Sequence, residues 1–303
     1  MLWRPSRAVK LVCWDRRGYP IFSNQRVTGL DKGETDKTLE AIAVETFAAL
    51  TGTRQIPPFC SRPGGLSLHD AYRVTPLVRQ MYEATGARTA GRKIGFTNRT
   101  IWAQYGVYAP IWGYVFDRSV QDLATTESLP LAAFSEPRIE PEIVFGLADA
   151  PSPQMDETAL MSCVDWVALG FEIVQSIYPG WKFSAADTVA ANGVHGALLV
   201  GPRQPVAPRP AEWQRALSRF EIDLNCDGRL IDRGQGENVL GGPLSALRHL
   251  VGLLANDPVN PPLAAGEIVS TGTLTKAMPV VSGETWGAMP RGIAIDAIQL
   301  RFF

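Results

Sequence analysis

The sequence has few of the residues on which many small-protein scaffolds depend. Its 303 residues include four cysteines that lie far apart and form no C-x-x-C pair, namely Cys13, Cys60, Cys163 and Cys226. This distribution argues against a structural zinc site or a disulfide framework and fits a reducing compartment. The three histidines also lack ligand spacing: they are His69, His195 and His249. We therefore do not expect a metal centre built on three histidines.

Strong net charge and long apolar runs are absent too. The formal net charge of −1 gives no electrostatic basis for binding nucleic acid or an anionic membrane surface. No run approaches the roughly 18–20 apolar residues that a membrane-spanning helix needs. The first thirty residues are basic, but they lack the apolar stretch of a secretory signal. We expect a cytoplasmic protein that binds neither nucleic acid nor membrane.

The composition is that of an ordinary globular protein, with 46% hydrophobic and 19% charged residues. Residues 1–35 are interpreted as a basic extension outside the fold. Apolar spacing predicts helices from Asp36 to Gly52 and from Ser67 to Gly86, joined by a loop rich in proline and glycine. Residues 36–90 are therefore expected to form a helical N-terminal lobe, and residues 91–303 the remaining domain.

Strands dominate the larger domain. The pattern predicts a short strand over residues 91–96, followed by a capping turn and a helix through Ile101 and Tyr105. A hairpin with its turn at residues 226–228 and a terminal strand over residues 292–303 are predicted further along. Because strands outnumber helices and do not alternate regularly with them, the expected fold class is α+β.

Three carboxylates are candidates for one metal site. In the segment R-I-E-P-E-I-V-F-G, Glu140 and Glu142 share one face of an extended chain, about 6–7 Å apart at the backbone, and can lean toward one hard divalent cation. A solvated loop is the alternative for an E-P-E triplet taken alone. Glu172 lies in the almost wholly apolar run of residues 164–174, where burying a carboxylate is costly unless it is paired or binds a metal. The alternative for Glu172 is an outward-facing position on a half-buried strand.

Other polar side chains stand in turn-rich segments. Lys93 lies between two glycines in G-R-K-I-G, but no phosphate-loop motif is present, so nucleotide binding is not supported and a surface lysine is the alternative. Lys182 and Asp187, in W-K-F-S-A-A-D-T, add one cation and one carboxylate. Thr273 belongs to the hydroxyl-rich turn S-T-G-T-L-T.

Five motifs occur in an order typical of one family: G-R-K-I-G-F-T, I-E-P-E-I-V-F, A-L-G-F-E-I-V, W-K-F-S-A-A-D-T-V-A-A-N-G and S-T-G-T-L-T. Together they resemble the 2-keto-4-pentenoate hydratase / 4-oxalocrotonate decarboxylase branch of the fumarylacetoacetate hydrolase superfamily, over roughly residues 36–303. The resemblance implies a mixed β-roll core and a Mg²⁺ or Mn²⁺ ion held by Glu140, Glu142 and Glu172. It also implies a homo-oligomer, a dimer or a multiple of it, and for some relatives a complex with a pathway partner enzyme.

The resemblance further implies a reaction. A small 2-oxo acid would chelate the metal through its carboxylate and 2-oxo oxygens, and the metal would stabilise the enolate as a Lewis acid. Lys93 would serve as a general acid/base or contact the substrate carboxylate. Lys182 would contact the substrate with Asp187 behind it, and Thr273 would belong to the substrate-binding turn. The expected activity is that of a hydratase first and of a 2-oxo acid decarboxylase second.

The sequence departs from the family pattern in two segments. Pro110 is followed by Ile111 where hydratases typically carry an acid, and their A-D-N-A-S stretch reads A-A-N-G-V at residues 190–194. Proton delivery would then fall to Lys93 or to water. Residues 110–117 are expected to form a covering loop, whose aromatic residues suit either a ring-bearing substrate tail or a dimer contact.

Two further functions stay open. An acylpyruvate C–C hydrolase needs a base that activates water, and His195 is a candidate without a supporting motif. A non-catalytic subunit that binds metal and 2-oxo acid without turnover is the other alternative.

Overall fold

The computed structural model describes residues 32–99, 102, 107 and 109–303, and it opens with a pair of helices. These are α1 (Lys32–Thr51) and α2 (Leu68–Ala84), separated by the short helix η1 (Phe59–Ser61). Ser67 caps α2 as predicted, because its hydroxyl oxygen accepts a hydrogen bond of 3.0 Å from the Asp70 amide. Helix α1 begins four residues before the predicted start, so residues 32–35 are helical and not part of an extension outside the fold. The rest of the basic segment, and most of the helix predicted through Tyr105, lie outside the described residues.

A large mixed sheet forms the centre of the molecule. Its strands run in the order β2-β1-β11-β5-β6-β7-β3, with β12 beside β5 and β8 beside β6. Their bounds are β1 (Thr89–Gly95), β2 (Ile111–Phe116), β3 (Val120–Asp122), β5 (Arg138–Leu147), β6 (Val164–Val174), β7 (His195–Val200), β8 (Gln204–Pro205), β11 (Ile268–Thr273) and β12 (Met278–Pro279). The β1–β11 and β3–β7 pairs are parallel, whereas β5 pairs antiparallel with both β6 and β11.

A smaller second sheet packs against the first. Its order is β10-β9-β13-β14-β4, from strands β4 (Ser128–Leu129), β9 (Glu221–Cys226), β10 (Arg229–Gln235), β13 (Thr285–Arg291) and β14 (Ile298–Phe302). One continuous apolar core joins the two sheets, with Leu169 and Phe145 from the first and Leu224 and Leu300 from the second. This two-sheet arrangement, with few helices between strands, confirms the predicted α+β class.

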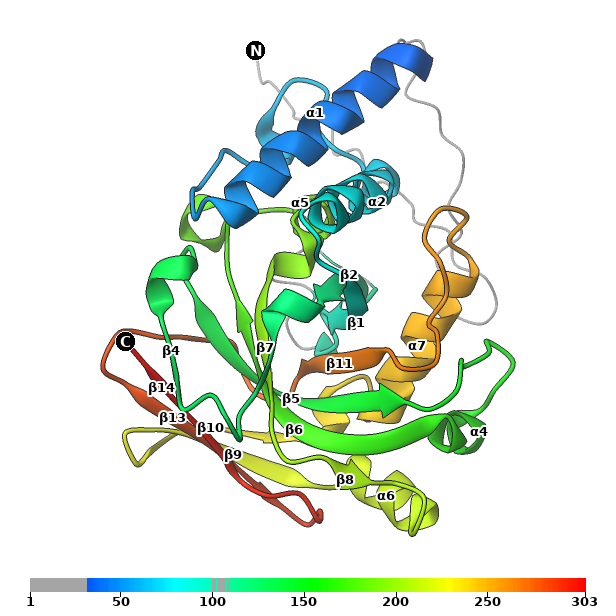
Figure 1. The fold of residues 1–303 in the computed structure, drawn as a ribbon, viewed down its shortest axis with the longest axis vertical. Helices are drawn as coiled ribbons and strands as arrows, with labels where there is room; N and C mark the ends of the chain where they lie inside the picture. The colour runs from blue at the N-terminus through cyan, green and yellow to red at the C-terminus, as the bar shows by residue number, and fades with distance from the viewer. Residues whose placement is uncertain (1–31, 100–101, 103–106, 108) are drawn as a thin grey trace, which may run out of the picture.

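The longer helices cover opposite ends of the sheets (Figure 1). Helices α1 and α2 lie together with the short α5 (Ala185–Ala190) and share an apolar core with it. Helices α4 (Glu157–Ser162), α6 (Pro210–Leu217) and α7 (Pro243–Ala255) lie along the other side. None of the helices in the described part of the chain combines the length and the apolar character needed to cross a membrane.

The segment predicted to be a covering loop, residues 110–117, contains strand β2, so that prediction is wrong. All six residues of β2 are buried, and the strand pairs antiparallel with β1. Trp112 stacks on Tyr72 of α2 with ring centroids 5.5 Å apart, and Tyr114 packs against the buried Arg92 guanidinium. These aromatic rings hold α2 to the sheet, which leaves them unavailable for a substrate tail or for a dimer contact.

The predicted hairpin is confirmed, whereas the predicted terminal strand is too long. Asp227 and Gly228 both have positive φ angles, of 49° and 75°, as a tight two-residue turn between β9 and β10 requires. At the C-terminus only Ile298–Phe302 pairs as strand β14. Residues 292–294 form bends and residues 295–297 have no regular secondary structure, and together they connect β14 to β13. The apolar residues of that connection alternate as they do in a strand. They form no strand because no described strand lies alongside for them to pair with.

We expect Trp112→Ala to lower the free energy of unfolding by about 3–5 kcal/mol, because the truncation leaves a cavity between α2 and the sheet. Phe303→Ala is the matched control, since Phe303 is 59% exposed and Trp112 only 1%. Chemical denaturation of both variants measures the difference. Equal losses in the two variants would show that Trp112 does not anchor α2.

Candidate metal centre and active site

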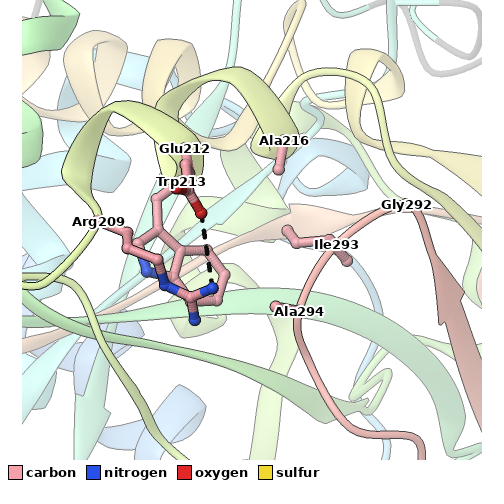
Figure 2. A pocket seen from close by; sticks show the side chains of 7 residues that line it. All are labelled: Arg209, Glu212, Trp213, Ala216, Gly292, Ile293 and Ala294. Atoms are coloured by element: carbon pink, nitrogen blue, oxygen red, sulfur yellow. Dashed lines mark ion pairs between the residues drawn. The ribbon is translucent and has the colours of Figure 1, made fainter.

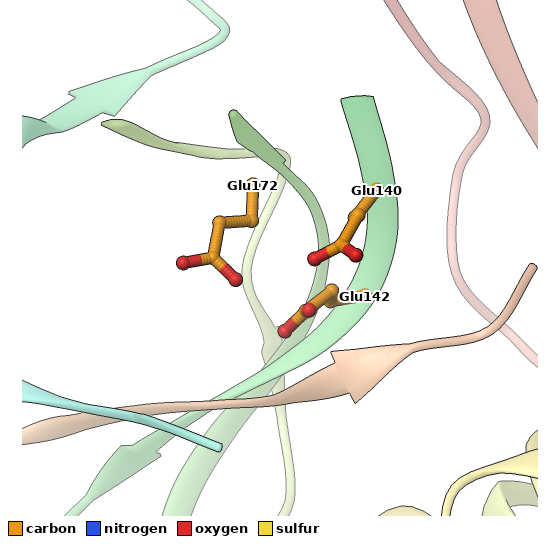
Figure 3. Close-up of side chains that lie close together, drawn as sticks. All are labelled: Glu140, Glu142 and Glu172. Atoms are coloured by element: carbon orange, nitrogen blue, oxygen red, sulfur yellow. The ribbon is translucent and has the colours of Figure 1, made fainter. Parts of the chain in front are cut away.

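Glu140, Glu142 and Glu172 converge on one point from two neighbouring strands. Glu140 of β5 lies directly opposite Glu172 of β6, and Glu142 lies opposite Gly170. One carboxylate oxygen from each residue lies within 4.8 Å of the others, and Figure 3 shows the three side chains turned toward a common space. The structure thus brings together the three residues predicted to form a metal site.

The local environment of these carboxylates is unfavourable to three negative charges. Glu142 and Glu172 are fully buried and Glu140 is half-buried. Burial raises the pKa of Glu142 well above its usual value, and the charges of Glu172 and Glu140 raise it further. Burial likewise raises the pKa of Glu140 to about 7, although Lys93 opposes the shift. Burial acts in the same direction on Glu172, but the charges of Lys93 and His195 outweigh it and hold the pKa of Glu172 below its usual value.

The donor set fits a hard divalent cation. Glu142 Oε2 accepts hydrogen bonds from Ser270 Oγ at 2.5 Å and from the Gly272 amide at 2.8 Å, which fixes the carboxylate. Its other oxygen, Oε1, is buried and has no hydrogen-bond partner among the described residues. A buried carboxylate oxygen without a partner is costly, and Mg²⁺ or Ca²⁺ is the kind of ion that three carboxylates bind.

Lys93 is a buried cation beside the carboxylates and not a surface lysine. Its side chain is 3% exposed, and its Nζ lies 2.9 Å from Glu172 Oε2 and donates a hydrogen bond of 3.1 Å to the Gly193 carbonyl oxygen. Burial alone would lower the pKa of Lys93, but the charges of Glu172, Glu140 and Glu142 outweigh it and raise the pKa above its usual value. Lys93 therefore carries a proton next to the three carboxylates.

The turn at Gly193 forms part of the wall around Lys93. Gly193 has a φ of +65°, and a Cβ atom there would lie 2.8 Å from Lys93 Cδ. The preceding Asn192 fixes the turn, because its side chain accepts a hydrogen bond from the Tyr114 amide and donates one to the Tyr114 carbonyl oxygen. Residues 190–194, where the sequence departs from the family pattern, thus form a turn whose backbone contacts Lys93.

His195 holds Glu172 from the side opposite to Lys93. Its Nδ1 lies 2.8 Å from Glu172 Oε1, and its Nε2 lies 2.8 Å from Ser119 Oγ. Both ring nitrogens are therefore engaged. From the sequence, His195 was only a candidate base without a supporting motif. No neighbouring residue indicated that the start of β7 would place His195 beside Glu172 of β6.

A cavity of about 310 Å³ opens beside the carboxylates, and Lys93, Glu140 and Thr273 line it. Thr273 lies opposite Glu142 on the neighbouring strand β11. The other lining residues include Arg138 and Lys276, and side chains that are largely apolar, namely Ile94, Phe96, Ile111, Val174, Trp181, Phe183, Val194 and Met278. A lining that combines a few charged groups with many apolar side chains suits a small organic acid.

Two of the predicted substrate-binding residues do not line this cavity. Lys182 is exposed. Asp187 is buried at the start of α5, where its carboxylate accepts hydrogen bonds from the Ser184 amide and hydroxyl and from the Cys60 amide. Their roles in binding substrate stay predictions of the family resemblance, while the contacts of Asp187 serve to cap α5 and to tie it to the η1 segment.

A larger hollow of about 480 Å³ lies away from the carboxylates, between α6 and residues 292–294 (Figure 2). Its polar groups are the exposed ion pair of Arg209 with Glu212, and Trp213 contributes part of the wall. Among the described residues that line it, none contributes a buried charge or a buried polar group without a partner. Size alone therefore does not identify the site, and the smaller cavity is the candidate.

Comparison with known proteins places the chain in a family. No family model matches it. The 2-keto-4-pentenoate hydratase 1 of Dechloromonas aromatica is 30% identical over 256 residues, which cover 84% of this chain and 94% of that protein. The chain belongs to the 2-keto-4-pentenoate hydratase family. The family assignment made from the five motifs is confirmed.

Solved structures agree with this assignment. The 4-oxalocrotonate decarboxylase of Pseudomonas putida G7, complexed with magnesium and adipate, is 25% identical, with a TM-score of 0.80 over 88% of this chain and 98% of that one. Fumarylpyruvate hydrolase from Pseudomonas aeruginosa, in complex with Mn²⁺ and pyruvate, shares the fold at 14% identity and a TM-score of 0.51, with 71% of this chain and 89% of that one covered. The predicted fumarylacetoacetate hydrolase-type fold is confirmed.

Gly193→Ala should destabilise the protein more than Gly228→Ala. Both glycines have positive φ, which costs a side-chain-bearing residue about 1–2 kcal/mol, but only the Cβ at residue 193 also meets other atoms, with none within 4 Å at residue 228. The difference between the two free energies of unfolding, measured by chemical denaturation, isolates the contact with Lys93. Equal losses would mean that the turn does not confine the lysine.

Proposed function

We propose that the protein is a divalent-metal-dependent hydro-lyase that adds water to a small 2-hydroxydienoic acid or to its 2-oxo tautomer. The observation that carries the proposal is the buried Glu142 Oε1, which has no hydrogen-bond partner among the described residues and lies beside Glu172 and Glu140. Glu140 and the buried Lys93 line the adjoining cavity. The hydratase relatives and the magnesium-complexed decarboxylase neighbour support it.

Glu140, Glu142 and Glu172 would hold the cation, and carboxylate oxygens suit Mg²⁺ and Mn²⁺. A cation held there would supply Lewis acidity toward the carboxylate and 2-oxo oxygens of the substrate. The protein's own contribution is to fix the donors before the ion arrives. Ser270 and Gly272 hold Glu142, and His195 holds Glu172.

Lys93 is the group best placed to move a proton in this cavity. Hydration of 2-hydroxypenta-2,4-dienoate places one proton on the terminal carbon, the hydroxyl group of water on the carbon beside it and one proton on C3. Water supplies one of these protons, and the 2-hydroxyl group loses the equivalent of the other as it becomes a 2-oxo group. Lys93 carries its proton at the cavity wall, held between Glu172 and the Gly193 carbonyl oxygen. Removal of a positioned general acid or base typically costs a factor of about 10²–10⁴ in rate.

The competing functions fit the geometry less well. A C–C hydrolase needs a base that is free to activate water, and both nitrogens of His195 are engaged by Glu172 and Ser119. The hydratase and decarboxylase relatives do not favour a subunit without turnover. Decarboxylation of a 2-oxo acid uses the same donors, so it stays the second candidate reaction. A homo-oligomer and a pathway partner enzyme stay predictions of the family resemblance.

We expect purified protein with Mg²⁺ or Mn²⁺ to hydrate 2-hydroxypenta-2,4-dienoate, and EDTA to abolish the activity. Glu142→Gln and Glu172→Gln should each remove both the activity and the rise in melting temperature that Mg²⁺ produces in the wild type, since each variant loses one of three donors. Ultraviolet absorbance of the dienoate and thermal unfolding with and without Mg²⁺ are the measurements.

Glu127→Gln is the matched control for these variants, because Glu127 is exposed and does not line the cavity. It should retain the activity and the Mg²⁺ shift. If the Glu142 and Glu172 variants respond to Mg²⁺ as the wild type does, the three-carboxylate site is wrong. A normal Mg²⁺ shift with no turnover of dienoates, oxaloacetate or acylpyruvates would instead favour the non-catalytic alternative.

Lys93→Met should lower kcat by about 10²-fold or more while Mg²⁺ binding persists, because the variant removes the proton donor and leaves the three carboxylates. Steady-state kinetics and calorimetric titration with Mg²⁺ separate the two effects. Lys37→Met, on the exposed surface of α1, is the control and should leave both unchanged. Lys182→Met tests the predicted substrate contact: a raised KM would support the contact, and full wild-type kinetics would exclude it.

A further inference from the structure

Three residues in the lining of the cavity have a backbone conformation that side chains disfavour. Phe96, Trp181 and Val194 all line the cavity, and their φ angles are +54°, +57° and +57°. Positive φ is uncommon for residues other than glycine, and it persists only where the surrounding structure imposes it. Such residues cluster at active sites and around bound ligands, so each of the three is a candidate for a role in binding substrate.

Trp181 is the clearest of the three, because a second residue with positive φ holds it. Gly180 and Trp181 both have positive φ, a pattern of tight turns in which glycine and asparagine are usual. The indole Nε1 of Trp181 donates a hydrogen bond of 3.0 Å to the carbonyl oxygen of Glu136, whose own φ is +45°. Two residues far apart in the sequence are thus held in disfavoured conformations against each other.

The Glu136 side chain fixes the same turn from a second direction. Its Oε1 accepts a hydrogen bond of 2.9 Å from the Gly180 amide and one of 2.7 Å from Gln55 Nε2. Gln55 follows helix α1, and its Nε2 also donates to the Ser176 carbonyl oxygen at 3.1 Å. One carboxylate oxygen therefore ties the turn at Trp181 both to the start of β5 and to the helical lobe.

The Trp181 ring is held in the cavity wall at a distance from the carboxylates. The Arg138 guanidinium lies over the ring, 4.2 Å from its centroid, and the ring of Phe183, which also lines the cavity, has its centroid 5.8 Å from that of Trp181. Arg138 and Glu140 leave the same face of β5, about 6–7 Å apart at the backbone. The ring thus lies where a substrate bound at the carboxylates would extend.

We propose that Trp181 contacts the part of the substrate beyond its metal-binding end, and that Glu136 is a positioning residue that holds the Trp181 ring in the cavity wall. Glycine would form the same turn without strain, so we attribute the tryptophan to the contacts of its ring. This inference rests on the proposed function, since the substrate must occupy this cavity. It extends that function to a wall away from the three carboxylates.

Steady-state kinetics with Mg²⁺ and 2-hydroxypenta-2,4-dienoate test the role of Glu136. Glu136→Ala removes the acceptor for Gly180 and Gln55, so we expect KM to rise at least fivefold with kcat within twofold of the wild type, the pattern of lost substrate binding. Glu136→Gln keeps an oxygen that can accept both bonds and should keep the wild-type KM. Oxalate has only a metal-binding end, and in calorimetric titration it should bind both Mg²⁺-loaded variants as it binds the wild type.

Trp181→Ala removes the ring itself and should raise KM at least as much as Glu136→Ala does. Trp166→Ala is its matched control, because Trp166 is also half-buried beneath an arginine, Arg203, but does not line the cavity. The control should keep the wild-type KM.

Quenching of tryptophan fluorescence by acrylamide tests the hold of Glu136 on the ring without any substrate. The difference in quenching between a protein and its Trp181→Phe variant reports on Trp181 among the eight tryptophans. We expect this difference to grow at least twofold in the Glu136→Ala background and to stay unchanged in the Glu136→Gln background. Glu136 is exposed, so its replacement leaves the buried core intact.

Glu284→Ala is the matched control for Glu136→Ala. Glu284 Oε2 also accepts two hydrogen bonds of 2.9 Å, one from the Val281 amide and one from the indole Nε1 of Trp286. None of these three residues lines the cavity, so the control should keep the wild-type KM and quenching difference.

Each result that contradicts the proposal has its own signature. Wild-type KM in Glu136→Ala, with quenching increased, would show that Trp181 does not contact the substrate. Unchanged quenching would show that Glu136 does not hold the ring, and a raised KM in both Glu136 variants would assign the effect to the lost charge and not to the hydrogen bonds. A wild type that binds neither oxalate nor the dienoate would refute the proposed function and the substrate contact with it, while quenching would still decide whether Glu136 holds Trp181.

Discussion

The burial of three carboxylates within a few ångströms of one another is the constraint on which the rest of this structure depends. Burial and mutual repulsion both disfavour the charged forms of these acids, which is why the pKa values of Glu140 and Glu142 are raised. Lys93 offsets part of this charge, and donors on β11 fix one of the carboxylates. A divalent cation would neutralise the remaining negative charge. The buried charge that lowers the stability of the folded protein is therefore the same charge that would favour binding of the ion.

The surrounding fold is arranged to hold this cluster rigidly. Strands β5 and β6 supply the three acids, and their antiparallel register places Glu140 against Glu172. Strand β1 supplies Lys93, with the turn before β7 packed against its side chain. Helix α2 covers the outer face of β2 through stacked aromatic rings and so secures the edge of the sheet next to the cavity. A site built on strands keeps its geometry better than one built on loops.

The cavity beside the carboxylates has a varied lining. Lys93 and Glu140 line it next to the carboxylate cluster, and Arg138 and Lys276 line it closer to solvent. Variation in the residues closer to solvent would change which acids the cavity favours, because specificity depends on the difference in free energy between competing ligands and not on the contacts that they share.

Local sequence patterns predicted the elements and the acids of this protein, but not the contacts across the sheet. The period of two in β5 placed Glu140 and Glu142 on one face, and the apolar run around Glu172 indicated a buried acid. Ser67 marked the start of α2. These three predictions succeeded because each depends only on neighbours within a few residues. The same reasoning failed for residues 110–117, where aromatic side chains that suggested a loop proved to be packing groups of β2. It offered His195 only as a candidate base without a supporting motif. The partner of His195 lies on another strand, so only the tertiary structure, which sets strand order and register, decided that His195 contacts Glu172 and that Lys93 lies beside the same carboxylate.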